Sequence, residues 1–230
     1  DASIIQSDGD TKYEVILDKY FEYDQNIYQN IHSLKEKIFN IKDLKKFSDE
    51  LSELERKITL FHAKTIKEFN SYGDNFLIGF HGQTIYHDSK EKISKQLGDG
   101  KLLYQLTKKK IIYNFRKNDI KNKGSGAPLA SIYHYNISKK INLLEPIIFL
   151  NIGGISNITF VNKNDLEAKD IGPGNVLIDE YIKKIKNQSY DKNGEIALTG
   201  KIDFGIVKQK LKHEFCNVKE KHSFDRGDFD

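Results

Sequence analysis

The sequence predicts an α/β protein with two lobes, and three observations support this. At 38% hydrophobic and 11% aromatic, the 230 residues can fill the core of one large domain or two modest ones. Residues 1–143 begin with a hairpin pattern and continue through helices and short apolar strands. Residues 144–230 open on a fresh series of strands that leads into a helix, so we place the lobe boundary near residue 143.

The first lobe is predicted from runs of β-branched and aromatic residues and from apolar residues spaced three and four apart. A turn cluster at 7–10 separates the first two runs, which is typical of a hairpin. We expect the hairpin, two helices and two short strands over residues 2–23, 27–38, 51–69, 76–80 and 110–113, in that order, with a further helical stretch around Leu103.

In the second lobe, residues 147–154 and 155–161 are predicted as two strands around a glycine turn. Residues 166–170 are predicted as a third strand, and residues 176–185 as a helix. Antiparallel strands followed by a helix therefore occur in both halves of the chain, although no sequence repeat proves a duplication.

Composition argues against several classes of function. The net charge of +4 is spread through mixed-sign segments, which does not favour nucleic-acid binding. The single cysteine, Cys216, permits no intrachain disulfide and suggests a reducing compartment. No apolar run approaches the roughly 18 to 20 residues of a membrane span, so we expect a soluble, cytoplasmic protein. Because the chain has no methionine and begins directly on a strand pattern, we expect that it is cut at both ends.

The string Leu-Asn-Ile-Gly-Gly-Ile-Ser-Asn at 150–157 is a candidate phosphate site. A Gly-Gly turn leaves backbone amides unshielded, so that they can converge on phosphate oxygens. The side chains of Asn151, Ser156 and Asn157 can add polar groups beside Gly153 and Gly154. Taken alone, a hairpin turn with glycine at positive φ is the commoner explanation of such a pair.

The string Asp-Ile-Gly-Pro-Gly-Asn at 170–175 places a carboxylate at a strand end, just before a helix. Gly172 and Gly174 permit a tight loop, and the positive end of the helix follows Asn175. Asp170 could therefore act as a general base or bind Mg²⁺. The alternative is that Asp170 only caps the helix.

Polar residues follow the strand predicted at 76–80. We expect His81, Gln83 and Thr84 to lie in the loop after its carboxyl end, where α/β proteins gather ligand contacts, and to bind sugar hydroxyls. A metal site made by His81 and His87 is less favoured, since no cysteine or acid stands at zinc spacing. Arg116, before the turn Gly-Ser-Gly-Ala-Pro, could bind a carboxylate or form a surface ion pair.

Eight short motifs follow one another along nearly the whole chain, namely HGQTIYH, LGDG, NFR, GSGAPL, NIGGISN, DIGPGN, YDKNGEIALTG and SFDRGDF. In this order they resemble the motifs of the anhydro-N-acetylmuramic acid kinase family. The resemblance implies a two-lobed actin-like (ribonuclease H-like) ATPase fold truncated at both termini, use of ATP and Mg²⁺, and a role in cytoplasmic peptidoglycan recycling. It also implies hydrolysis of the 1,6-anhydro bond, phosphorylation of the sugar at O6, and a possible homodimer.

By the same resemblance, Asp170 matches the catalytic aspartate, while Arg116 and the segment 81–84 match the sugar side of the site. Asn175 stands in the loop beside the catalytic acid, and we expect it to bind the substrate. A second set matches phosphate-binding positions of the cofactor site, namely Asp1, Asn151, Gly153, Gly154, Ser156, Gly172 and Gly174.

The chain departs from the family pattern at two positions. Asn114 replaces the usual aspartate before Phe-Arg, and Ile171 replaces a threonine. They leave open the alternative of a degenerate, non-catalytic sugar- or nucleotide-binding protein. A second alternative is a kinase for another sugar, because related kinases share the fold and differ in their substrate loops. We also predict that the chain is inactive alone, because the resemblance implies that the family's first phosphate loop and its adenosine site lie outside it, and phosphoryl transfer depends on positioning the phosphates.

Overall fold

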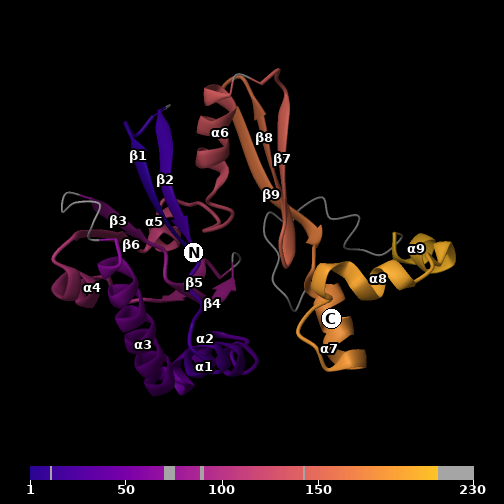
Figure 1. The fold of residues 1–230 in the computed structure, drawn as a ribbon, viewed down its shortest axis with the longest axis horizontal. Helices are drawn as coiled ribbons and strands as arrows, with labels where there is room; N and C mark the ends of the chain where they lie inside the picture. The colour runs from indigo at the N-terminus through magenta and orange to yellow at the C-terminus, as the bar shows by residue number, and fades with distance from the viewer. Residues whose placement is uncertain (11, 70–75, 89–90, 142, 212–230) are drawn as a thin grey trace. The chain divides into compact units, whose positions relative to one another are not determined.

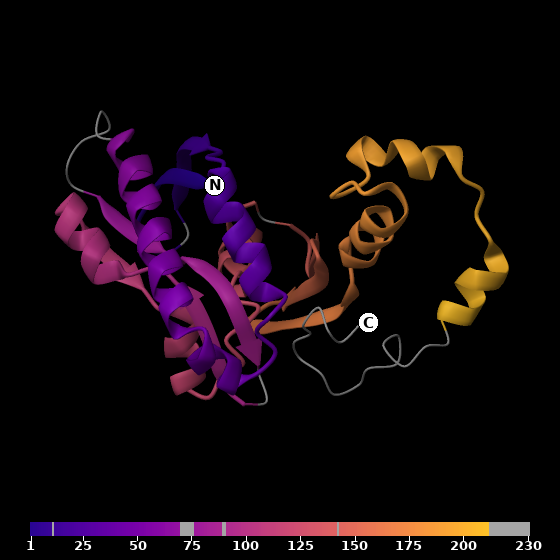
Figure 2. The same ribbon diagram turned by 90° about the horizontal axis from the view of Figure 1, so that it is seen from below.

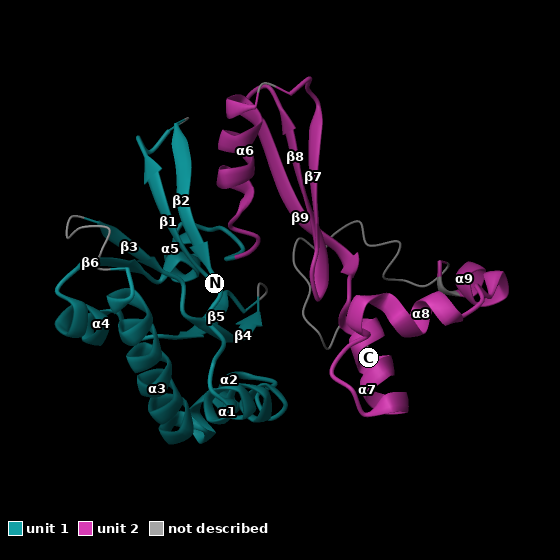
Figure 3. Cartoon of the chain, in the orientation of Figure 1, with its two compact units in different colours: residues 1–126 teal, residues 127–230 magenta. Residues whose placement is uncertain are grey.

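The computed structural model of the chain describes residues 1–10, 12–69, 76–88, 91–141 and 143–211. The chain divides into two compact units, Asp1–Gly126 and Ala127–Asp230 (Figure 3). Both units contain helices and strands (Figure 1), which confirms the mixed α/β class. Cys216 and the motif at 223–229 lie outside the described residues.

The first unit opens with the predicted hairpin. Strands β1 (Ala2–Ser7) and β2 (Tyr13–Lys19) pair antiparallel, with an irregularity between Ile4 and Ile5. The turn between them is held by the carboxylate of Asp8, whose Oδ1 accepts the amides of Asp10 and Lys12 at 3.0 Å each. The turn cluster seen in the sequence thus closes the hairpin through a side chain.

Helices α1 (Gln25–Lys35) and α3 (Ser48–Lys67) confirm the two predicted helices. Asp24 caps α1 by accepting the amide of Ile27 at 2.9 Å. A short helix, α2 (Ile41–Lys46), was not predicted, because one and a half turns show no apolar periodicity; a capping box of Asn40 and Asp43 starts it.

Strands β3 (Leu77–Phe80) and β6 (Lys110–Tyr113) are parallel neighbours, as expected of an α/β layer. Helix α4 (Gly100–Thr107) precedes β6 and packs beside α3 (Figures 1 and 2). In the chain, an antiparallel hairpin lies between β3 and α4, made of β4 (Gln83–Asp88) and β5 (Ile93–Leu97). Sequence reasoning missed this hairpin. Helix α5 (Phe115–Lys121) follows β6 and contacts β5.

The core of the first unit joins α1 and α3 to one face of the β4–β5 hairpin. Leu97, at the end of β5, is fully buried in it, and burying a leucine contributes about 1.5 to 3 kcal/mol. The cluster contains Ile27, Ile31, Leu34, Ile38, Leu51, Leu54, Ile58, Ile85, Tyr86 and Leu97. A smaller cluster of Ala63, Phe80 and Leu103 joins α3 and α4 to the end of β3.

The second unit contains a three-stranded antiparallel sheet of β7 (Ile147–Ile152), β8 (Ile155–Asn162) and β9 (Asp165–Pro173). Helix α7 (Val176–Lys186) follows directly. These elements confirm the predicted three strands and helix. Three short elements complete the described part, a 3₁₀ turn at Lys192–Gly194, α8 (Glu195–Thr199) and α9 (Phe204–Lys210).

Helix α6 (Ser131–Lys140) belongs to the second unit, whereas the predicted boundary near residue 143 put it in the first lobe. It packs on β8 and β9. His134 Nδ1 lies 2.8 Å from Thr159 Oγ1, and the imidazole stacks on Phe149 with 4.9 Å between ring centroids. These contacts join residues that are far apart in the sequence. The local sequence near residue 143 therefore did not show which segments pack together.

An ionic staple ties the end of α6 to the β8–β9 turn. Lys139 Nζ donates to Glu145 Oε1 at 2.6 Å and to the carbonyl of Lys163 at 2.9 Å. The amide of Lys163 donates to the other oxygen of Glu145. The hydrogen bond from Lys139 lowers the pKa of Glu145 and raises the pKa of Lys139, because it stabilises both charged forms.

Within the described ranges, the helices are all too short or too polar to cross a lipid bilayer.

Candidate active site

A row of polar side chains crosses the sheet of the second unit near the glycine turn. Asn151 on β7 lies opposite Asn157 on β8, and Asn157 lies opposite Asp170 on β9. Residues directly opposite one another point to the same face with Cβ atoms about 4.5 to 5.5 Å apart. Asp170 is only 9% exposed. The sheet thus holds a buried carboxyl group next to an amide side chain.

A β-bulge follows Asp170 directly. Asn157 pairs with Asp170, whereas Ser156 pairs with Gly172, so Ile171 is the extra residue on β9. Gly172 has φ +147°, where an L side chain is strained, so this position requires glycine. Bulges of this kind re-aim neighbouring side chains and occur often beside active sites. Ile171, one of the departures from the family pattern, is 42% exposed at the bulge.

The glycine turn and the loop before α7 are joined by backbone hydrogen bonds. The amides of Gly174 and Val176 donate to the carbonyl of Gly154 at 2.9 and 3.2 Å, and the amide of Asn175 donates to the carbonyl of Gly153 at 2.7 Å. A Cβ atom on Gly174 would lie 2.1 Å from the Gly153 oxygen, so the close approach itself requires glycine. The structure thus brings together the two motifs that the sequence singled out.

Gly153 and Gly154 do not adopt the left-handed conformation, so positive φ does not explain this pair. A Cβ atom on Gly154 would meet nothing within 4 Å. The turn therefore presents a stretch of backbone with open space beside it, as an anion site requires.

The start of α7 differs from the interpretation of Asp170 as a helix cap. Asn175 occupies the cap position, so Asp170 lies inside β9 and does not cap the helix. Because the amides of Asn175 and Val176 are used by the glycine turn, they do not face a ligand. The next amides, of Leu177 and Ile178, have no intrahelical acceptor in a helix that starts here.

The first unit holds the second group of predicted residues. His81 follows β3, and Gly82 turns the chain with φ +70°. Gln83 and Thr84 lie on β4, which corrects the expectation of a loop, because this segment pairs with β5. The turn is tightly packed, since a Cβ atom on Gly82 would lie 2.4 Å from the Leu97 carbonyl oxygen.

His81 is held by its neighbours. Its Nδ1 lies 3.0 Å from the carbonyl oxygen of Gly82, and Gln96 contacts both its ring and its backbone carbonyl. Partial desolvation of the ring lowers the pKa of His81, the Gly82 hydrogen bond opposes this, and the positive charge of Arg116 lowers the pKa further. Arg116 is therefore close enough to act on His81.

Arg116 is half-buried near the start of α5. Asn114 precedes the helix in the left-handed conformation, with φ 62°, which asparagine and aspartate tolerate better than most residues. The asparagine at this departure thus retains a backbone role. Asp119 on the same helix accepts the amide of Gly126 at 2.7 Å and so orders the Gly-Ser-Gly-Ala loop.

The predicted residues therefore form two groups, one in each unit. His81, Gln83, Thr84 and Arg116 lie in the first unit with the exposed Asp1, which precedes β1, whereas the glycine turn and Asp170 lie in the second. Sequence reasoning missed Gln96, although it directly precedes the motif LGDG. It named Asn157 only as a phosphate donor, because strand register is not visible in a single strand's sequence.

The model of the anhydro-N-acetylmuramic acid kinase family matches residues 1–230. The chain belongs to this family. It is 52% identical to the anhydro-N-acetylmuramic acid kinase of Pelagibacter ubique and 35% identical to that of Agrobacterium fabrum. Both alignments, and one at 34% identity with the Brucella canis kinase, cover the whole chain. The chain spans 63% to 64% of the length of these relatives.

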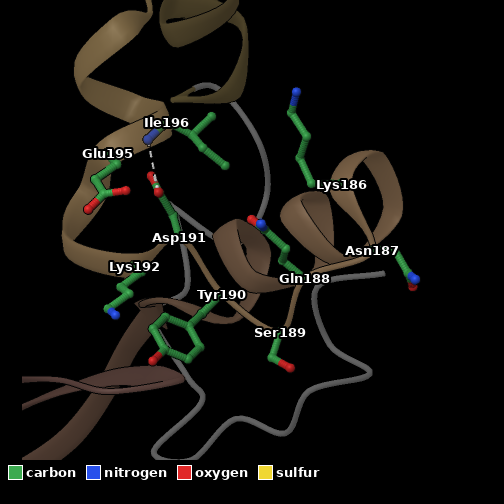
Figure 4. Close-up of a pocket in the computed structure, with 9 residues that line it drawn as sticks. All are labelled: Lys186, Asn187, Gln188, Ser189, Tyr190, Asp191, Lys192, Glu195 and Ile196. Carbon is green, nitrogen blue, oxygen red and sulfur yellow. Dashed lines mark hydrogen bonds between the residues drawn. The ribbon is translucent and has the colours of Figure 1, made fainter.

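The motif at 190–200 contributes to a surface hollow of about 600 Å³ (Figure 4). The hollow is lined by residues 186–192, 195 and 196, none of which belongs to the predicted site. The carboxylate of Asp191 accepts the amides of Ile196 and Ala197 at 2.9 and 3.0 Å. Asp191 therefore stabilises the first turn of α8, and we assign this motif a structural role.

Metal-ligand clusters of three or more His, Cys, Asp or Glu side chains do not occur among the described residues. A kinase does not require one, because Mg²⁺ is usually bound through one or two carboxylates, waters and the substrate phosphates.

Proposed function

We propose that this chain carries the sugar-binding and phosphate-binding parts of a two-lobed, actin-like kinase. The proposed reaction hydrolyses the 1,6-anhydro bond of anhydro-N-acetylmuramic acid and phosphorylates O6, giving N-acetylmuramic acid 6-phosphate. The observation that carries the proposal is the buried Asp170, aligned with Asn157 beside the glycine turn, in a chain of this family.

Asp170 is assigned the role of general base. It takes a proton from the water that attacks C1 of the sugar, and the O6 oxygen released from the bridge then becomes the phosphoryl acceptor. The amide of Asn157, directly across the sheet, orients the carboxylate. The bulge at Ile171 turns the chain away immediately after Asp170, which separates the base from the helix start.

The glycine turn is assigned to the phosphates of ATP. The open side of Gly154 and the helix-start amides of Leu177 and Ile178 suit an anion. The polar side chains of Asn151 and Ser156 border the same turn. When bound, ATP supplies the γ-phosphoryl group and Mg²⁺ neutralises phosphate charge. Gly172, Gly174 and Asn175 hold this turn in place, and Asp1 is assigned to the same phosphate site by family resemblance.

The first unit is assigned to the sugar. Arg116 binds the lactyl carboxylate, because its guanidinium matches a carboxylate with two parallel hydrogen bonds. Gln83 and Thr84 bind sugar hydroxyl or amide groups from β4. His81 holds the turn that precedes them. We also propose that the protein works in the cytoplasm in peptidoglycan recycling, and that it forms a homodimer.

A chimera tests the proposal. These 230 residues replace the matching segment of the Pelagibacter ubique relative, which is 52% identical. With ATP, Mg²⁺ and anhydro-N-acetylmuramic acid, mass spectrometry should detect N-acetylmuramic acid 6-phosphate. A phosphorylated sugar that keeps its anhydro ring, or no product from a folded chimera, would contradict the proposed reaction.

A further inference from the structure

The side chain of Gln96 contacts both the ring and the backbone carbonyl of His81. Its side-chain nitrogen Nε2 lies 3.0 Å from the carbonyl oxygen of His81 and 3.0 Å from Nε2 of the His81 imidazole. The His81 carbonyl can only accept a hydrogen bond, so the amide nitrogen of Gln96 and not its oxygen must face it. The same nitrogen therefore also donates to the ring.

This arrangement determines the tautomer of His81. Since Gln96 donates to Nε2, that ring atom carries no proton and accepts the bond. The proton of the neutral ring is then on Nδ1, which lies 3.0 Å from the carbonyl oxygen of Gly82 and donates to it. Both ring nitrogens are thus engaged within the protein, and a second ring proton would displace the Gln96 amide.

Gln96 itself lies on a strand that is hydrogen-bonded to α3. It lies on β5 opposite Thr84, one of the proposed sugar ligands. Directly after it, the amides of Gly98 and Asp99 donate to Glu55 Oε1 at 3.1 Å and to Thr59 Oγ1 at 3.0 Å, which anchors the end of β5 to α3.

The His81–Gly82 turn, which Gln96 contacts from β5, is also closely packed. Gly82 approaches the Leu97 carbonyl, and a Cβ atom on Gly98 would lie 2.7 Å from the ring of Phe80, the residue before His81. Gln96 thus connects two closely packed segments, the His81–Gly82 turn and the end of β5.

We propose that Gln96 is a positioning residue, which holds His81 as the neutral Nδ1–H tautomer and thereby sets the turn before Gln83 and Thr84. The consequence for sugar binding rests on the proposed function. In this scheme His81 transfers no proton and does not contact the sugar through its ring nitrogens. Its role is to fix the His81–Gly82 turn against β5, so that Thr84 meets the substrate already oriented.

The test is a histidine titration of this 230-residue chain by NMR with ¹⁵N-labelled imidazoles, with the His81 signal assigned by its loss in His81→Gln. The wild-type ring should show the Nδ1–H pattern. Gln96→Leu removes the donor to the neutral ring and should raise the pKa of His81 by about 0.5 to 1. Gln96→Glu adds an acceptor that favours the imidazolium and should raise the pKa further. The matched control is Ser94→Ala, also on β5, which should leave the titration unchanged.

An Nε2–H tautomer in the wild type, or an unchanged His81 pKa in both Gln96 variants, overturns the proposal. If one variant fails to fold, the other and the wild-type tautomer still decide it. Binding of anhydro-N-acetylmuramic acid is measured separately, and Gln96→Leu should weaken it if the wild type binds. A wild type that binds no sugar counts against the proposed function, whereas the tautomer result tests Gln96 independently.

Discussion

Replacing Gly174 with alanine should detach the loop before α7 from the glycine turn. The added Cβ atom would lie 2.1 Å from the Gly153 carbonyl oxygen and 2.9 Å from Ser156 Oγ, so one segment must move. Overpacking of this kind costs about 1 to 3 kcal/mol. The hydrogen bonds from Gly174 and Asn175 to the turn would weaken as well, at about 0.5 to 1.5 kcal/mol each. The expected local destabilisation is therefore about 2 to 6 kcal/mol.

Gly154→Ala is the matched control. It lies in the same contact, but its Cβ atom would meet nothing within 4 Å and its φ is not in the left-handed region. The expected change is within about 1 kcal/mol. Hydrogen exchange is the suitable assay, because a chain of two units need not unfold in one step. Protection of the Gly174 and Asn175 amides should fall by at least about 30-fold in Gly174→Ala and stay near wild type in the control.

Exchange in residues 1–126 provides the internal reference and should not change in either variant. Equal protection of the Asn175 amide in the two variants would refute the reasoning. The close contact between Gly174 and Gly153 would then have no effect on the stability of the loop. A loss of protection in both units would also refute it, because the effect would not be local.

Three further predictions concern chemistry, recognition and pH. In the chimera, Asp170→Asn should lower kcat by about 10² to 10⁴ while sugar affinity stays within about tenfold, and a near-normal kcat would exclude Asp170 as the base. Arg116→Ala should raise KM for the sugar more than it lowers kcat, because the proposed partner is remote from the reacting bond; steady-state kinetics separate the two. The pKa of Glu145 is lowered in the folded chain, so its stabilising effect is present above its ordinary pKa and is lost as pH falls through the lowered value. Glu145→Gln should therefore flatten the acid side of the stability profile of the second unit. This profile is measured between about pH 3 and 7 as urea midpoints of NMR signals from residues 127–211, and an unchanged profile would show that the contacts of Glu145 with Lys139 and Lys163 contribute nothing.

The two motifs of the candidate site could be singled out from the sequence. The glycine turn and the Asp170 loop each combine residue types with a physical requirement, namely bare backbone, a carboxylate and a helix start, and their role in catalysis stays a prediction. The strands around them were also predictable, since β-branched residues and turn residues alternate there. Their meeting by three backbone hydrogen bonds was not readable from either motif alone.

Other features were lost to sequence reasoning for particular reasons. The β4–β5 hairpin was missed because polar residues such as Gln83, Thr84 and Gln96 occupy strand positions, where one face is not packed in the core. Helix α6 belongs to the second unit although it precedes the boundary expected near residue 143, because its partners, Phe149 and Thr159, come later in the chain. Local composition carries no information about which distant segment a helix will contact.

By itself, the sequence determined the α/β class and the family, because these depend on local patterns and on ordered motifs. It also supplied the candidate functional residues, whose roles stay predictions. Only the tertiary structure decided that Asp170 is buried opposite Asn157 and that Gly174 must lack a side chain. It also revealed Gln96 as the partner of His81. Each of these facts depends on strand register or on close approach between distant segments, and a one-residue shift in register would reverse the face of every side chain on a strand.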